Sequence, residues 1–206
     1  MRGTVGVMRR ALPTVALMVA LAGCAAAPPG PSVIVPGAPG EPARVVDGAE
    51  AAQRRSPVPV SPADVEFAAR MVPHHRQALE LAALAPDRAA DPGVRAVAER
   101  IAAVQGPEIA VLESWLARHG GAHLPHADHA AMPGMATPAQ RDELAAADGP
   151  GFDALFVALM IAHHEGALEM AAQVRSSGTD LTIAEFADGV VATQSADIDR
   201  LRGLLR

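Results

Sequence analysis

The sequence predicts an all-α protein, a four-helix bundle made of two tandem helical hairpins that are related by a pseudo-twofold axis. Three observations support this fold class. Half of the 206 residues are hydrophobic but only 2% are aromatic, and an Ala-rich aliphatic core favours closely packed helices over a sheet. Apolar residues recur three or four positions apart in several long segments, which is the helical period. The two halves of the folded region also repeat each other, which predicts a duplicated hairpin.

Residues 1–23 are predicted to be a signal peptide with a lipobox. Three arginines precede an apolar run over residues 11–21, as in an export signal, and this run is too short to span a bilayer comfortably. The run leads into Leu-Ala-Gly-Cys, which resembles the bacterial lipobox, whose cysteine is acylated. Lipid on Cys24 would anchor the protein to the extracytoplasmic face of the cell membrane. An unlipidated signal, or an ordinary buried cysteine, is the alternative.

Residues 24–60 are predicted to be a lipid-anchored, Pro/Gly/Ala-rich linker that is disordered and semi-extended. Eight of the 18 prolines lie in this segment, which has no helical periodicity. An extended, buried segment around residues 33–35 is the weaker alternative, because Pro36 and Pro39 would interrupt any ladder that it formed.

The four-helix domain is predicted to cover residues 61–206 and to contain an internal repeat. At an offset of 89 residues, the sequence matches itself over a whole hairpin. We therefore divide the domain into repeat 1 (61–118), a connection (119–149) and repeat 2 (150–206). The matched pairs include Asp64/Asp153, Phe67/Phe156, Met71/Met160, His74/His163, His75/His164, Ala78/Ala167, Glu80/Glu169, Gln105/Gln194 and Ile109/Ile198, with acids at Glu108/Asp197.

Local signals predict where the helices begin. Ser61 and Asp91 each precede a proline, as an N-cap precedes proline at the first helical position. Pro73 and Pro107 lie inside the two helices of repeat 1, and each is expected to kink or locally open its helix. The predicted helices cover residues 62–84, 92–118, 151–175 and 181–204, with a short extra helix near Thr137-Pro138.

Charge and cysteine content exclude several function classes. The formal net charge is −6, and all 17 basic residues are arginines. A nucleic-acid binder needs a basic face that displaces counterions, so we expect no nucleic-acid partner. One cysteine cannot form an intramolecular disulfide, and it excludes Cys-based zinc fingers and CxxC redox motifs.

Paired histidines on the first and third long helices are candidate metal ligands. Neighbouring helical residues point about 100° apart, so each pair puts one imidazole near the seam and one at its flank. Methionines one turn before the histidines add thioether ligands. When the second helix folds back along the first, Gln105 is expected at the depth of Met71 in the bundle and Glu108 at the depth of Phe67, as outer partners of the ligands. Alternatively, buried His and Gln only hydrogen-bond across the bundle. The candidate ligands are Met71, His74, His75, Met160, His163 and His164, and their expected outer partners are Gln105, Glu108, Gln194 and Asp197.

A second set of candidate ligands lies in the connection, where five residues recur at strict intervals of three. In an extended, polyproline-like chain this interval puts all five on one face. Imidazoles followed by thioethers suit copper in both oxidation states, and zinc at the imidazole part. The alternative is a polar loop whose composition is accidental. These residues, called the His/Met ladder below, are His123, His126, His129, Met132 and Met135.

Other chemistries match the sequence less well. A ferritin-type di-iron site needs Glu-x-x-His, but no glutamate stands three residues before any of the paired histidines. The CxxCH and G-x-S-x-G motifs are absent from the sequence, while His/Met ligation of a non-covalent haem stays open. Asp64 and Asp153 are interpreted as first-turn acids that the helix dipole favours.

A doubled Met-x-x-His-His motif and several shorter motifs stand at defined spacings along the chain. They are Asp64-x-x-Phe67-x-x-x-Met71-Val-Pro-His74-His75, Gln105-x-x-Glu108-Ile109, Trp115-Leu116, Met132-Pro-Gly-Met135 and Phe156-x-x-x-Met160-Ile-x-His163-His164.

This set of motifs resembles the bacterial family of domain of unknown function 305, over residues 61–204. The resemblance implies a ferritin-like four-helix fold, export or lipid anchoring, and a relation to periplasmic copper-binding proteins that are connected with copper resistance. It implies metal roles for the two Met-His-His sets and for the methionine pair of the ladder. The chain departs from the family pattern at Gly106-Pro107, where an uninterrupted helix is expected.

These observations together predict an exported, lipid-anchored protein without enzymatic activity that buffers or transfers copper, with zinc as the other candidate ion. The expected partners are the membrane, through lipid on Cys24, the metal ion, and a protein that donates or accepts the metal. Two alternatives stay open. One is a structural or interaction module whose histidine pairs are structural, and the other is a haem- or iron-dependent redox protein.

Overall fold

The computed structural model describes residues 32–35, 40–54, 59–119 and 132–205. The chain divides into two compact units, residues 1–56 and residues 57–206, and each is described by itself. The predicted signal peptide and Cys24 lie outside the described residues. Export, lipid anchoring and the domain boundaries therefore stay predictions.

In the first unit, the segment predicted to be a disordered linker contains a β-hairpin and a short helix. β1 (Ser32–Val35) pairs antiparallel with β2 (Arg44–Asp47), and α1 (Gly48–Arg54) follows. The prediction of disorder was wrong here because β1 ends before Pro36, so the prolines follow the strand and do not interrupt its ladder. Val46 supplies the buried apolar side chain of this hairpin.

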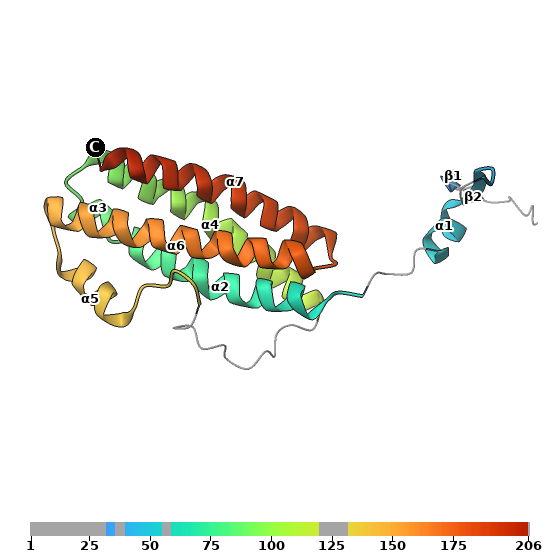
Figure 1. Ribbon diagram of the computed structural model, residues 1–206, viewed down its shortest axis with the longest axis horizontal. Helices are drawn as coiled ribbons and strands as arrows, with labels where there is room; N and C mark the ends of the chain where they lie inside the picture. The colour runs from blue at the N-terminus through green and yellow to red at the C-terminus, as the bar shows by residue number, and fades with distance from the viewer. Residues whose placement is uncertain (1–31, 36–39, 55–58, 120–131, 206) are drawn as a thin grey trace, which may run out of the picture. The chain divides into compact units, whose positions relative to one another are not determined.

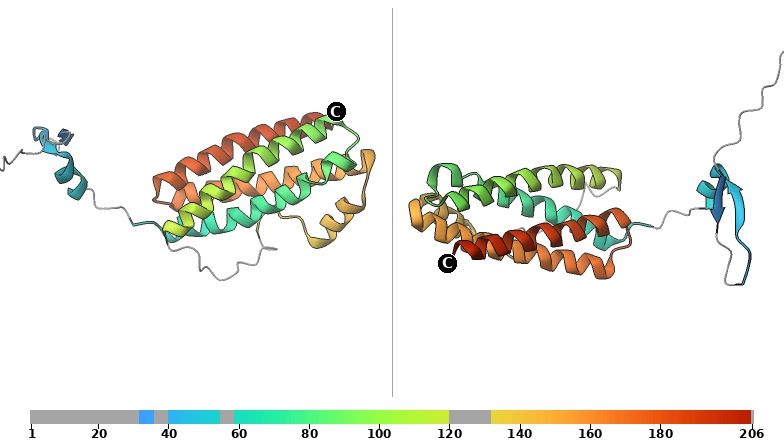
Figure 2. Two further views of the ribbon diagram at one scale, coloured as in Figure 1. Left: turned by 180° about the vertical axis from the view of Figure 1, so that it is seen from behind. Right: turned by 90° about the horizontal axis from the view of Figure 1, so that it is seen from above.

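The second unit consists of the helices α2 (Pro62–Ala82), α3 (Ala85–Arg88), α4 (Pro92–Arg118), α5 (Pro138–Ala146), α6 (Gly149–Ser177) and α7 (Leu181–Leu204). Its four long helices form the predicted bundle (Figures 1 and 2). α2 packs against α4 to form one hairpin, and α6 packs against α7 to form the other. The two hairpins meet mainly through α2 and α6, while α4 also contacts α7.

Capping side chains begin the helices near the predicted positions. Ser61 and Asp64 form a capping box at the start of α2, and Thr137 and Gln140 form one at the start of the short helix α5. The Asp91 side chain caps α4. A proline follows each of these caps, at the position where its missing N–H leaves no hydrogen bond unmade.

Neither internal proline of repeat 1 ends its helix. α2 continues through Pro73, and α4 continues through Pro107. Despite Gly106-Pro107, α4 keeps Gln105 and Glu108 on one continuous helix. These two residues therefore lie three apart on the same face of α4.

Among the described residues, α6 alone has the length and hydropathy of a membrane-spanning helix. Half of its apolar window is buried inside the molecule, as expected for a core helix of a bundle. Its buried residues include Phe156, Ala167 and Val174, which pack in the core together with residues of the other three long helices.

Two apolar clusters fill the bundle, one in each half of its length. One cluster contains Ile101, Phe156 and Met160, and the other contains Met71 and Trp115. Between the two clusters, all four long helices contribute buried histidine, glutamine or acidic side chains. This polar layer interrupts the apolar packing in the middle of the bundle, and it is the candidate site.

Two aspartates join the repeats to each other. Oδ2 of Asp64, on α2, accepts hydrogen bonds from the backbone N–H groups of residues 179 and 180 at 3.0 and 3.1 Å. Asp153, on α6, accepts hydrogen bonds from the backbone N–H groups of residues 90 and 91 at 3.1 and 2.9 Å. Each aspartate therefore binds the interhelical loop of the other repeat. Asp64 also stands in the first turn of α2, as predicted. The interpretation of Asp153 as a first-turn acid was wrong, because α6 begins at Gly149 and its first turn contains no acid.

Candidate metal centre

The four paired histidines are fully buried in the middle of the bundle. His74 and His75 lie on α2, and His163 and His164 lie on α6, each with 0% of its surface exposed. Buried polar side chains are almost always hydrogen-bonded. The partners of each imidazole nitrogen therefore decide what this layer can do.

His74 and His163 face each other between α2 and α6. Their ring centroids are 3.8 Å apart and the ring planes are inclined by 38°. Nε2 of His74 lies 3.1 Å from the carbonyl oxygen of Pro133. A carbonyl oxygen only accepts hydrogen bonds, so this contact assigns the proton to Nε2 and leaves a lone pair on Nδ1.

His75 forms a hydrogen bond with a carboxylate on α4. Nε2 of His75 lies 2.9 Å from Oε2 of Glu108, whose side chain is 19% exposed. The carboxylate accepts this bond, which leaves the lone pair of His75 on Nδ1. The expected neighbour of Glu108 was Phe67, two helical turns away on α2, and this expectation was wrong. The expectation assumed that a simple loop folds α4 directly back along α2. The connection instead contains the short helix α3, which changes which residues of the two helices lie side by side.

His164 stands in the equivalent position of repeat 2, but its carboxylate is engaged elsewhere. Nε2 of His164 is 3.7 Å from Oδ2 of Asp197, which is too long for a hydrogen bond. Nε of Arg100 lies 2.6 Å from Oδ1 of Asp197, and Nη1 of Arg200 lies 3.3 Å from the same oxygen. The Asp197 side chain is only 4% exposed.

The remaining predicted residues of the bundle are buried in or beside the same layer. Met71 and Met160 are 0% exposed and lie one turn before His75 and His164 on the same helices. The side-chain oxygen of Gln105 has no hydrogen-bond partner among the described residues, and neither polar atom of Gln194 has one. These residues are therefore buried in or beside the polar layer but not at one depth, since Met71 belongs to one apolar cluster and Met160 to the other. Because Glu108 bonds to His75 on the antiparallel helix α2, Gln105 lies on the side of His75 away from Met71, and its expected place at the depth of Met71 was wrong.

Burial keeps the central imidazoles uncharged. It lowers the pKa of His74 to about 3, and the hydrogen bond to Pro133 only partly opposes this effect. Burial also lowers the pKa of His163 well below its ordinary range, and repulsion from His74 and from the neighbouring His164 adds to the shift. Neutral imidazole is the form that binds a metal ion.

Six imidazole nitrogens of this layer have no hydrogen-bond partner among the described residues. They are Nδ1 of His74 and of His75 and both ring nitrogens of His163 and of His164. Each neutral ring keeps a proton on one nitrogen, so the four rings offer four lone pairs. These lone pairs, together with buried thioethers, fit copper, which accepts both imidazole and thioether ligands. In the part of the chain that the structure describes, no three His, Cys, Asp or Glu side chains are grouped as a metal site. A bound ion would therefore need methionine or glutamine ligands as well, or a change of side-chain conformation.

A segment that we call the strap, residues 132–136, crosses the layer between α2 and α6. It contains a β-turn in which the Met135 backbone N–H donates to the Met132 carbonyl oxygen, at 3.4 Å. Pro133 and Gly134 occupy the central positions, and Gly134 has a φ of 74°. This combination is typical of a type II turn, which needs a positive φ at its third residue.

Two features hold the strap against the bundle. The Gln77 side chain, on α2, donates to the carbonyl oxygen of Ala136 at 3.0 Å and accepts from its backbone N–H at 2.7 Å. On α6, Gly166 lets the strap approach closely, because a Cβ at that position would collide with the carbonyl group of Pro133. The strap therefore places the Pro133 carbonyl against His74.

The His/Met ladder is described only at its methionine end, since His123, His126 and His129 lie outside the described residues. Met132 is buried and Met135 is partly buried. The interpretation of the ladder as an extended chain was wrong for these two methionines, because the Pro-Gly pair between them forms a turn. The metal roles of the five residues stay a prediction.

Several residues that shape the layer were missed in the sequence. Gln77 of repeat 1 corresponds to Gly166 of repeat 2, and Arg100 corresponds to Gly189. The useful signal was that these positions break the repeat, and among such positions only Pro73 and Pro107 were interpreted from the sequence. A duplicated fold tends to break its own symmetry where one copy has acquired a contact that the other lacks.

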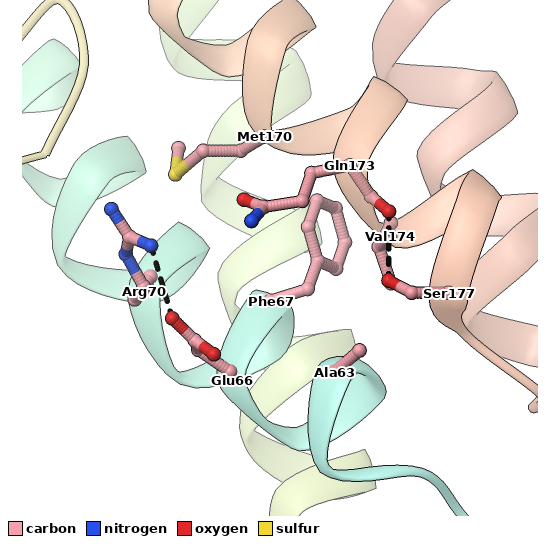
Figure 3. A pocket seen from close by; sticks show the side chains of 8 residues that line it. All are labelled: Ala63, Glu66, Phe67, Arg70, Met170, Gln173, Val174 and Ser177. Carbon is pink, nitrogen blue, oxygen red and sulfur yellow. Dashed lines mark hydrogen bonds and ion pairs between the residues drawn. The ribbon is translucent and has the colours of Figure 1, made fainter.

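A separate small cavity lies between α2 and α6, beside Phe67 and Met170 (Figure 3). Its volume is about 40 Å³. Nη1 of Arg70 pairs with Oε1 of Glu66 at 3.1 Å along its wall. The cavity is lined by no histidine, and its ionic side chains satisfy each other, so the polar layer remains the candidate site.

Several solved structures are similar to this chain. A protein from Streptomyces coelicolor that is described as secreted is 32% identical, with a TM-score of 0.63 over 69% of this chain and 91% of that one. A fragment from Deinococcus radiodurans is 31% identical, with a TM-score of 0.65 over 72% of this chain and 98% of that one. Both are DUF305 proteins. No curated protein sequence matches this chain.

The protein CopM has been solved in Cu(I)-bound, Cu(II)-bound and silver-bound forms. Its Cu(II)-bound form is 28% identical to this chain, with a TM-score of 0.59 over 68% of this chain and 94% of that one. The family profile described as Domain of unknown function (DUF305) matches residues 64–205. That range contains the whole polar layer and nearly all of the bundle, and the chain belongs to the DUF305 family.

Proposed function

We propose that this protein is an exported, lipid-anchored copper-binding protein that buffers copper or transfers it at the outer face of the membrane. The observation that carries the proposal is the set of buried imidazole nitrogens without hydrogen-bond partners among the described residues. A buried polar atom without a partner is unfavourable. A metal ion would supply the missing partner.

The donor chemistry supports copper over the other ions of the first transition row. The proposed ligands are the histidines together with Met71 and Met160, and thioethers select soft ions such as Cu(I). Imidazole also accepts Cu(II) or zinc. The 28% identity to CopM, which binds copper and silver, is a further argument for this donor set.

The His/Met ladder is proposed as a second binding segment. The strap holds its methionine end against the bundle, and His74 contacts that strap through Pro133. Metal bound by the ladder would therefore be delivered close to the buried imidazoles. Export is supported by a relative that is described as secreted, and the lipid anchor on Cys24 rests on the lipobox.

The competing interpretation makes the histidines a structural polar layer. It predicts that each buried nitrogen has a partner within the bundle, as in other satisfied cores. Six nitrogens in the described part of the chain have none. This observation favours metal binding over the purely structural module, and no observation on the described residues favours haem.

Copper titration with a thermal readout tests the proposal. An ion that binds only the folded protein stabilises it by about 2.7 kcal/mol at 100 times its Kd, so we expect Cu(I) and Cu(II) to raise the Tm. Two variants are compared with the parent, one with the four bundle histidines replaced by Ala and one with the five ladder residues replaced by Ala.

Loss of whole copper equivalents in each variant would support both segments. Circular dichroism without metal checks that each variant still folds. If the parent binds copper no more tightly than an unstructured His-rich peptide does, and its Tm stays constant, the metal proposal fails and the structural interpretation stands.

A further inference from the structure

The two repeats present related half-sites that differ in charge. The repeat 1 half-site consists of Met71, His75, Gln105 and Glu108, and the repeat 2 half-site consists of Met160, His164, Gln194 and Asp197. In each, the methionine and histidine lie four apart on one helix, and the glutamine and acid lie three apart on the next. The ligand types are therefore nearly the same, and the difference lies in what surrounds the acid.

In the repeat 1 half-site, the carboxylate serves the imidazole alone. Glu108 accepts the hydrogen bond from Nε2 of His75 at 2.9 Å. Within the described residues, no arginine forms an ion pair with Glu108. Nδ1 of His75 is buried without a partner, as is the side-chain oxygen of Gln105. A carboxylate that holds the proton of one ring nitrogen orients the other nitrogen toward a metal and raises its basicity.

In the repeat 2 half-site, two arginines compete for the carboxylate. Asp197 pairs with Arg100 at 2.6 Å and with Arg200 at 3.3 Å. Its other oxygen stays 3.7 Å from Nε2 of His164. This half-site therefore carries two positive charges against one negative charge, whereas the repeat 1 half-site carries one negative charge only.

Neither arginine has an arginine counterpart at the equivalent position of the other repeat. At the offset of 89 residues, Arg100 corresponds to Gly189 and Arg200 corresponds to Val111. A Cβ at Gly189 would meet no heavy atom within 4 Å, and Val111 is 51% exposed. Glu108 also keeps a 19% exposed side chain, compared with 4% for Asp197, so an incoming cation reaches the first carboxylate more easily.

We propose that a Cu(II) ion binds at the repeat 1 half-site through Nδ1 of His75, with Glu108 as the positioning residue, and that Arg100 and Arg200 keep the repeat 2 half-site from binding one. Two guanidinium groups beside a carboxylate that is only 4% exposed oppose an incoming cation, although solvent screens part of this repulsion because the arginine side chains are 36% and 49% exposed. This inference rests on the proposed copper function. The inference goes further by stating which half of the duplicated site binds the doubly charged copper ion.

The experiment uses the repeat itself as a matched control. The parent is the full chain with His123, His126 and His129 replaced by Ala, so that the ladder imidazoles do not contribute. Cu(II) affinity is measured by competition with a chromophoric chelator, and the bound ion is followed by its electron paramagnetic resonance spectrum. The paired variants are Glu108→Gln with Asp197→Asn, and His75→Ala with His164→Ala.

We expect Glu108→Gln to weaken Cu(II) binding by about 10- to 100-fold, as the loss of an outer carboxylate does. His75→Ala removes the ligand itself and should weaken binding at least as much. The repeat 2 variants should leave the affinity unchanged. Glu108→Gln keeps a hydrogen-bond acceptor for His75, so it should weaken Cu(II) more than the singly charged Cu(I). A merely structural role for Glu108 would weaken both ions alike.

A gain-of-function variant tests the arginines. Arg100→Gln combined with Arg200→Gln should add a second Cu(II) equivalent. Thermal unfolding of the double variant without copper, compared with that of the parent, checks that the fold is kept. Equal losses in the two repeats would overturn the inference and leave copper binding intact. No added equivalent in the double variant would overturn the role of the arginines. Absence of Cu(II) binding in this parent while the unsubstituted chain binds copper would overturn the inference, whereas absence of binding in both would overturn the proposed function.

Discussion

At the scale of single residues, the carboxylate of Asp64 shows how a buried charge can be kept in a helical bundle. Burial alone would raise the pKa of Asp64, but hydrogen bonds from Thr179, Ser61 and Asp180 outweigh it and lower the pKa below its ordinary value. A lowered pKa in the folded state means that the ionised group stabilises the fold at neutral pH. This stabilisation is lost as the pH falls through the folded-state pKa.

Asp64→Asn is expected to destabilise the bundle by about 1–3 kcal/mol at pH 7, because an amide accepts fewer of these bonds. The difference from the parent should shrink as the pH falls below the ordinary aspartate value of 3.8. Urea unfolding at pH 7 and at pH 3 measures both. Asp153→Asn is the matched control, since that carboxylate accepts two backbone hydrogen bonds. A destabilisation of Asp64→Asn that does not change with pH would contradict the argument.

Gln77→Ala is expected to release the strap. The substitution leaves the backbone N–H and carbonyl group of Ala136 without their side-chain partner, and a buried group left unsatisfied costs about 1–3 kcal/mol. Hydrogen exchange at the Ala136 amide should accelerate more than exchange in the long helices. Gln173→Ala, at an exposed position of α6, controls for the loss of a glutamine. Unchanged exchange at Ala136 would mean that other contacts hold the strap.

At the scale of elements, the helices follow from local sequence but their relative register does not. Ser61 and Asp91 predicted the starts of α2 and α4, and both helices begin where these caps place them. The predicted position of Glu108, on α4, relative to α2 was wrong by about two helical turns. The reason is that α3, in the connection between the two helices, was not predicted. A helix start depends on a few adjacent residues, whereas register depends on the whole path of the connection.

The close contact between the strap and α6 can be tested by adding one methyl group. Gly166→Ala would push the strap away, since the new Cβ would collide with the Pro133 carbonyl group. We expect a net loss of stability, even though alanine favours the helix by roughly 0.5–1 kcal/mol over glycine. Gly189→Ala, on α7, has no neighbour within 4 Å and should be stabilising by that amount. Thermal unfolding of both variants measures whether each substitution lowers or raises the stability. Stabilisation by both substitutions would show that the strap yields at no cost.

At the scale of the whole molecule, the two repeats depend on each other. Asp64 of repeat 1 binds the loop before α7, and Asp153 of repeat 2 binds the loop before α4. The facing rings of His74 and His163 also come from different repeats. Because each hairpin supplies hydrogen-bond partners that the other needs, the four long helices are expected to unfold together.

The second unit is expected to fold without the first. A fragment of residues 57–206 contains both apolar clusters and the polar layer. Its far-ultraviolet circular dichroism and its Tm should match those of the bundle in the full chain, with a single cooperative transition. A Tm lowered by several degrees would show that residues 1–56 contribute to the stability of the bundle.

The sequence by itself determined the fold class, the long helices and the repeat, and it singled out the paired histidines, which are buried in the bundle. These features depend on periodicity and on short-range capping, which a single chain displays directly. The hairpin at residues 32–47 was missed, because pairing joins residues that local propensity treats separately.

Only the tertiary structure decided which partner each imidazole nitrogen has. Two identical His-His pairs in the sequence became unlike sites, since Glu108 bonds to His75 while Arg100 draws Asp197 away from His164. Pro133, 59 residues beyond His74, became its hydrogen-bond acceptor. The physical reason is that hydrogen bonds and ion pairs depend on distances of a few tenths of an ångström between side chains far apart in sequence, and such distances are set by the packing of the whole bundle.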